Sequence, residues 1–134
     1  MKFLDLKELQ ERVAGELELN EYNVSEANKR NIPYQHRYLT LKYEEEEKLD
    51  ELRAVKDRLH DRLYDQYRWR NDKIIKHKDE LLGKVTSDPR WRKFMRIYRK
   101  QERIVNYLEK VVGLFEKRSF SITNLFKELE REDG

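Results

Sequence analysis

The amino-acid sequence predicts an all-α protein, and three observations lead to this prediction. Charged residues make up 43% of the 134 residues, against about 25% in an ordinary soluble domain, so apolar side chains are too few for a large globular core. The chain has only 4 Gly and 2 Pro, which leaves few turns. No segment alternates polar and apolar residues over any length, as a strand would. We therefore expect an elongated protomer of long helices, such as a helical hairpin, with narrow apolar stripes.

The first expected helix spans residues 3–18, because apolar residues recur there at steps of three and four. Asn20 and Asn23 interrupt this pattern. A second helix is expected to begin near Ile32 and Pro33, since proline suits a first helical turn. It continues toward Asn71, because no helix-breaking residue intervenes.

A short helix is expected between residues 71 and 86, capped by Asn71 or Asp72 and ended by Gly83. Its apolar positions are Ile74, Ile75, Leu81 and Leu82. The motif Ser87-Asp88-Pro89 then starts a third helix, with Asp88 as the cap and Pro89 in the first turn. After Arg118 and Ser119 a separate last segment is expected.

The charge is unevenly distributed along the chain. Residues 1–52 carry 8 Lys/Arg and 13 Asp/Glu, a net charge of −5, and residues 104–134 carry 5 and 6, a net charge of −1. Residues 53–103 carry 17 and 8, a net charge of +9. A basic middle between acidic ends is typical of a face that binds a polyanion. A solvated helix surface with ion pairs at i,i+4 is the alternative.

Basic residues interleaved with aromatic ones suit non-specific binding of a single strand, in which bases stack on rings and cations follow the backbone. Trp69 lies off the main apolar stripe and is the preferred stacking candidate, whereas the aromatic residues between 90 and 100 are expected in the core. The candidate DNA-binding residues are Arg58, Arg62, Arg68, Trp69, Arg70, Lys73, Arg92, Lys93 and Arg96.

Narrow apolar stripes also indicate self-association, because two long helices can bury them against each other or against other subunits. A monomeric hairpin remains the alternative. The candidate oligomerisation residues are Tyr98, Val105, Leu108, Val112, Phe115, Phe120, Ile122, Leu125 and Phe126. We assign residues 1–86 to DNA binding and residues 87–134 to assembly, within one structural unit.

The sequence offers little for catalysis or metal binding. It has no cysteine, its three histidines lack metal-ligand spacing, and no glycine-rich phosphate loop or serine nucleophile motif is present. We expect no catalytic residue, no metal and no cofactor. No apolar run approaches the roughly 20 residues of a membrane span, so we expect a soluble intracellular protein.

The C-terminal third resembles the phage UvsY-type recombination mediators. Ser87-Asp88-Pro89 opens a helix that contains Leu108-Glu109-Lys110-Val111-Val112, and the segment Arg118-Ser119-Phe120-Ser121-Ile122-Thr123-Asn124 follows. The long helix is similar as well, in Ile32-Pro33, His36-Arg37-Tyr38 and the basic run into Tyr64 and Tyr67. The resemblance is most specific over residues 87–131.

This resemblance implies a non-enzymatic protein that binds single-stranded DNA as a ring-like homo-oligomer in the cytoplasm of an infected bacterial host. It implies two protein partners, a UvsX-like phage recombinase and the phage single-strand DNA-binding protein, since such mediators help load the first onto a strand coated by the second. It points to Arg58 and Arg62 for DNA contact. A structural coiled-coil scaffold or adaptor without nucleic-acid function is the alternative.

Overall fold

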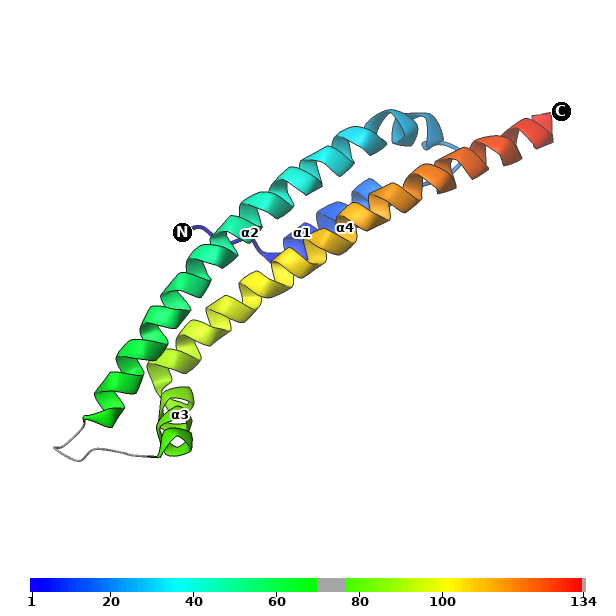
Figure 1. Cartoon of the computed structure of the whole chain (residues 1–134). Helices are drawn as coiled ribbons and strands as arrows, with labels where there is room; N and C mark the ends of the chain where they lie inside the picture. The colour runs from blue at the N-terminus through cyan, green and yellow to red at the C-terminus, as the bar shows by residue number, and fades with distance from the viewer. Residues whose placement is uncertain (70–76, 134) are drawn as a thin grey trace. The chain divides into compact units, whose positions relative to one another are not determined.

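The structure, a computed structural model, describes residues 1–69 and 77–133. Within these residues the secondary structure consists of the helices α1 (Leu6–Leu17), α2 (Val24–Arg68), α3 (Lys78–Ser87) and α4 (Pro89–Asp133) (Figure 1). No strand occurs in this described part, so the all-α prediction is confirmed. The chain divides into two compact units, one of residues 1–46 and 103–134 and the other of residues 47–102.

The first helix is shorter than the predicted span because a side chain fixes its start. The Asp5 carboxylate accepts hydrogen bonds from the backbone N–H groups of Lys7 (2.9 Å) and Glu8 (3.2 Å), which satisfies two donors that have no partner within the helix. Asp5 is therefore the N-cap of α1. The helix buries Leu9 and Val13, one turn apart, so its apolar stripe faces the core as its spacing predicts.

The main core of the first unit joins three helices. Leu9 and Val13 of α1 pack with Tyr38 of α2 and with residues 104–115 of α4, among which Phe115 is fully buried. The rings of Tyr38 and Phe115 stack with centroids 5.4 Å apart. The Tyr38 hydroxyl donates to the Glu16 carboxylate (2.7 Å), and burial together with this bond raises the pKa of Tyr38 to about 12. This core depends on α4 as much as on the two N-terminal helices.

The second helix begins earlier than predicted, at Val24, so that Pro33 lies inside it. A smaller cluster explains this start, since Val24 and Ala27 are buried against Ile122 of α4. The Asn31 side-chain amide also donates to the Phe115 carbonyl (3.0 Å), which ties the same stretch to α4. These contacts offset the backbone hydrogen bond that proline cannot donate.

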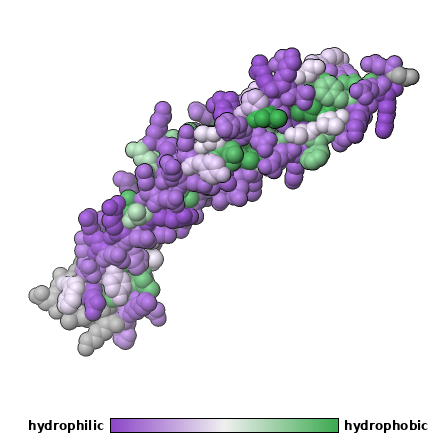
Figure 2. Space-filling model, turned by 45° about the horizontal axis from the view of Figure 1, so that its top comes forward, coloured by the Kyte–Doolittle hydropathy of each residue, from purple (hydrophilic) through white to green (hydrophobic). Residues whose placement is uncertain are grey.

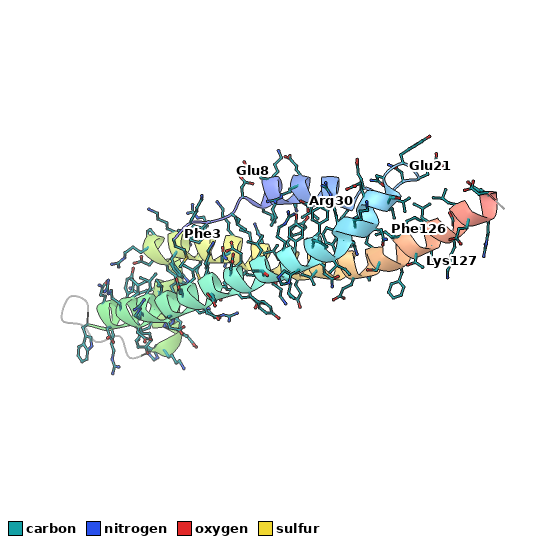
Figure 3. The ribbon with its side chains drawn as sticks, turned by 90° about the horizontal axis from the view of Figure 1, so that it is seen from above. Phe3, Glu8, Glu21, Arg30, Phe126 and Lys127 are labelled. Atoms are coloured by element: carbon teal, nitrogen blue, oxygen red, sulfur yellow. The ribbon has the colours of Figure 1, made fainter. Side chains whose placement is uncertain are left out.

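The predicted break after Arg118 and Ser119 is wrong, because α4 continues to Asp133. The apolar stripe carries on through Ile122, Leu125, Phe126 and Leu129, which pack on the start of α2. Figure 3 shows Phe126 and Lys127 in this last part of α4, with Arg30 near the start of α2 and Glu21 in the turn before it. Burial against α2 therefore outweighs the weak helix preference of the serine and threonine residues here.

The second unit contains the C-terminal part of α2, α3 and the first part of α4. Its buried apolar residues are Leu49, Leu52, Leu63, Leu81, Val85 and Tyr98. Gly83 lies inside α3 rather than at its end, because Leu81 and Val85 are buried one turn apart on either side of it. The proposed caps Asn71 and Asp72, and also Ile74 and Ile75, lie outside the described residues.

Candidate nucleic-acid interface

The two compact units differ in net charge. Residues 47–102 carry 17 Lys/Arg and 11 Asp/Glu, a net charge of +6. The other unit carries 13 Lys/Arg and 16 Asp/Glu, a net charge of −3. The second unit is thus the more basic one, and all of the predicted DNA-binding residues belong to it.

Two arginines of α2 and Trp69, the residue that directly follows this helix, lie on the same side. At 100° per residue, Arg62 is turned by about 40° from Arg58, and Trp69, three turns further on, by about 20°. All three side chains are exposed, and Trp69 is 60% exposed. Neither guanidinium has a carboxylate partner among the described residues. Two unpaired cations and one accessible ring thus share a face about 16 Å long.

The Arg68 guanidinium lies over the Trp69 ring. Its guanidinium carbon lies 5.5 Å from the centre of the Trp69 ring, a cation–π distance. Arg68 is exposed, so the predicted basic cluster at the end of α2 exists up to residue 69. The predicted contacts Arg70 and Lys73 lie outside the described residues.

Contacts within the second unit show which sides of α2 and α4 face each other. The rings of His60 and Trp91 meet edge to face with centroids 5.6 Å apart. Tyr98 receives a hydrogen bond from Arg53 Nε (3.2 Å), and Lys56 Nζ lies 4.8 Å from the Tyr98 ring centre. Residue 60 is therefore opposite residue 91, and residue 56 opposite residue 98, so the two helices are antiparallel here.

This pairing brings Lys93 to the same side as the arginines of α2. Residues two positions apart on a helix point about 200° apart. His60 and Trp91 meet on one side of the helix pair. Arg58 and Arg62 are each two positions from His60, and Lys93 is two positions from Trp91. These three side chains therefore project on the opposite side of the helix pair. We call Arg58, Arg62, Trp69 and Lys93 the basic face.

Arg92 and Arg96 lie on the side of α4 that faces away from Gln101. Arg92 is turned by about 180° from Gln101, which is fully buried, and Arg96 by about 40° from Arg92. Both are exposed and project from α4 away from its packed side. Arg96, three positions after Lys93, is turned by only about 60° from it and therefore borders the basic face, whereas Arg92 is turned by about 100°.

A buried carboxylate joins the end of α2 to the start of α4. Asp88 accepts from the Tyr67 hydroxyl (2.7 Å), from the backbone N–H of Arg90 (2.8 Å) and from the Arg90 guanidinium (3.0 Å and 3.1 Å). The hydrogen bonds from Arg90, and then the one from Tyr67, hold the pKa of Asp88 well below its usual range. The sequence predicts the cap, and that prediction is confirmed. It contains no signal for the bond to Tyr67.

The predicted oligomerisation residues divide by exposure. Tyr98, Val105, Leu108, Phe115 and Ile122 are buried within the chain itself. Val112, Leu125 and Phe126 are partly buried, whereas Phe120 is 74% exposed. In Figure 2, small groups of hydrophobic side chains interrupt a largely hydrophilic face. Phe120 is thus the member of the predicted set that is most accessible to another subunit.

The described residues contain no group of three or more His, Asp or Glu residues placed to hold a metal ion. No helix within them is long and apolar enough to cross a membrane.

The fold is that of a class of solved structures described as recombination mediators, which confirms the predicted resemblance at the level of the fold. The matching solved structures are crystal forms of the recombination mediator protein UvsY of bacteriophage T4, to which this chain is similar in fold. One crystal form of UvsY, lattice type II, matches this chain with a TM-score of 0.86 and 15% sequence identity, over 98% of this chain and 100% of UvsY. A second crystal form, lattice type IV, matches with a TM-score of 0.84 and 13% sequence identity, over 98% of this chain and 100% of UvsY. No family model and no curated protein matches the sequence.

Proposed function

We propose that this protein is a recombination mediator that binds single-stranded DNA without sequence specificity and helps load a recombinase. The proposed protein partners are a UvsX-like phage recombinase and the phage single-strand DNA-binding protein. The proposed setting is recombination, repair and recombination-dependent replication in an infected bacterial cell. The proposed role is non-enzymatic, with a ring-like homo-oligomer as the working form. Support comes from the shared fold and from the charge of the second unit.

The basic face is the observation that carries this proposal. Guanidinium groups on Arg58 and Arg62 can pair with successive phosphates, and Lys93 adds a third cation on the same side. The accessible ring of Trp69 offers a stacking surface to an unpaired base, and every base has such a face. A duplex keeps its bases stacked inside, so this combination favours a single strand.

Fluorescence anisotropy with a labelled oligonucleotide tests the proposal. We expect the full chain to bind single-stranded DNA more tightly than duplex of the same length, with affinity that falls steeply as salt rises, because counterions are released from the phosphates. The double variant Arg58→Ala with Arg62→Ala should bind weakly while its oligomeric mass stays unchanged. The matched control is Lys110→Ala with Lys117→Ala, which removes two exposed cations of α4 in the other unit. Equal losses in both variants would refute the assignment to the basic face.

A coiled-coil scaffold is the competing function, and one observation favours it. Many of the charged side chains form ion pairs on helix surfaces, such as Arg12 with Glu16 and Arg30 with Glu26, as in proteins that merely need solvated helices. A scaffold predicts no increase of affinity with oligonucleotide length. The same anisotropy experiment with oligonucleotides of several lengths separates the two functions.

A further inference from the structure

Five cations cluster on α4 around Arg96, and one of them, Lys93, also belongs to the basic face. The residues three and four positions before and after Arg96 are all basic: Arg92, Lys93, Arg99 and Lys100. All five side chains are exposed. Residues at these spacings are neighbours on a helix surface, so the five groups form one patch of positive charge about 12 Å long. We call this patch the α4 cation cluster.

The cluster contains no side chain other than its cations. At 100° per residue, its members cover an arc of about 120° of the helix surface, from Arg99 to Lys93. Every residue between positions 90 and 102 that falls within this arc is Arg or Lys. The centre of the arc, Arg96, is turned by about 140° from Gln101, which is fully buried. The cluster thus faces away from the packed side of α4 and offers neither a ring to a base nor an apolar group to a protein.

No carboxylate compensates the charge of the cluster. Elsewhere in the chain, cations pair with an acidic residue three or four positions away, such as Arg12 with Glu16 (3.2 Å) and Arg53 with Asp50 (3.1 Å). None of the five cations forms an ion pair within the part of the chain that the structure describes. Like charges three or four positions apart destabilise a helix. The free protein therefore contains a repulsion that a bound polyanion would remove.

The cluster continues the basic face without a gap, because Lys93 belongs to both surfaces. Lys100 is turned by only about 20° from Lys93 and lies about 10 Å further along α4, and Arg96 is turned by about 60°. A strand whose phosphates contact Arg58, Arg62 and Lys93 can therefore run on over α4 to further cations.

We propose that the α4 cation cluster is a second contact site for the sugar-phosphate backbone of the single strand that the basic face binds. This inference rests on the proposed function. Guanidinium groups form bidentate, charge-assisted hydrogen bonds with phosphate. Because the cluster has no aromatic ring, it holds the backbone regardless of the bases, whereas Trp69 supplies the stacking. An acidic protein segment fits less well, since the centre of a protein interface is apolar.

The triple variant Arg92→Gln, Arg96→Gln and Arg99→Gln tests this proposal, because it leaves Lys93 and the rest of the basic face intact. In anisotropy titrations of the full chain with single-stranded DNA, the slope of log affinity against log salt should fall by about 2, at about 0.7 for each lost phosphate contact. The melting temperature should not fall, because the three side chains are exposed and glutamine favours a helix about as well as arginine.

The matched control is Lys110→Gln with Lys117→Gln and Lys127→Gln, which removes three exposed cations of α4 in the other unit and should keep the wild-type slope. An oligonucleotide without bases separates backbone contacts from base contacts. On this strand the cluster variant should lose affinity by the same factor as on an ordinary strand. Trp69→Ala should weaken binding to the ordinary strand alone.

An unchanged slope in the cluster variant would overturn the proposal, as would an equal fall in the control or a loss confined to the strand with bases. An unchanged slope together with lost binding of polyglutamate would assign the cluster to an acidic protein partner instead. If Arg58→Ala with Arg62→Ala weakens binding and the cluster variant does not, this inference fails and the proposed function stands. If the wild type binds no single strand, the proposed function itself fails.

Discussion

Replacing Asp88 should destabilise the protein more than any other single change of a charged side chain in the second unit. Asp88 is buried, caps α4 through the Arg90 backbone and binds the Tyr67 hydroxyl. Loss of an N-cap costs about 1 kcal/mol, and loss of a hydrogen bond to a charged group about 2 kcal/mol. Asp88→Ala should therefore lower the free energy of unfolding by about 3 kcal/mol. Asp88→Asn, which keeps a capping oxygen, should lower it by about half as much.

Urea unfolding followed by circular dichroism at several pH values measures this effect. Because the folded-state pKa of Asp88 is lowered, its ionised form stabilises the fold above the ordinary carboxyl pKa of about 3.9, and this contribution is lost as the pH falls below that value. The difference between wild type and Asp88→Asn should thus be largest near pH 7 and shrink below pH 4. The control Asp65→Asn, at an exposed position, should change stability by less than about 0.5 kcal/mol. A gap that stays constant down to pH 3 would refute the reasoning.

Four further outcomes are expected. Arg58→Ala with Arg62→Ala removes two phosphate contacts, so the slope of log affinity against log salt for single-stranded DNA should fall by about 1.4, and an unchanged slope in anisotropy titrations contradicts this. Trp69→Ala should weaken binding by about 1–3 kcal/mol in the same assay, whereas Trp69→Phe keeps a ring and should lose less. Gly113→Ala should raise the melting temperature by about 4 °C in calorimetry, because an added Cβ meets nothing within 4 Å and alanine favours the helix by about 1 kcal/mol. Phe120→Ser should reduce the mass measured by light scattering without lowering the melting temperature, since the side chain is exposed; an unchanged mass would argue against its role in assembly.

Periodicity and capping signals carried most of the fold prediction. The apolar spacing of α1, the uninterrupted run of α2 and the Asp88-Pro89 start of α4 depend on local sequence, so they could be predicted. The start of α2 could not, because Val24 and Ala27 are held by Ile122, almost a hundred residues away. The continuity of α4 past Ser119 depends on the same contact. Where distant packing overrides a weak local preference, the sequence pattern alone predicts a boundary that does not form.

In the candidate site, too, some features could be predicted from local sequence and others depend on contacts between distant residues. The exposure of Trp69 could be predicted, since it lies off the apolar stripe. The placement of Lys93 on the same side as the arginines of α2 depends on the pairing of His60 with Trp91, which no local pattern contains.

The two tryptophans give the protein a built-in optical reporter. Trp69 is solvent-exposed on the basic face, whereas Trp91 is half-buried against His60 on the other side of the helix pair. The emission of Trp69 therefore responds to a stacked base, and the emission of Trp91 responds to its packing against the His60 ring. A Trp69→Phe chain isolates the second signal, so occupancy of the basic face and the state of the helix pair can be followed separately without a label.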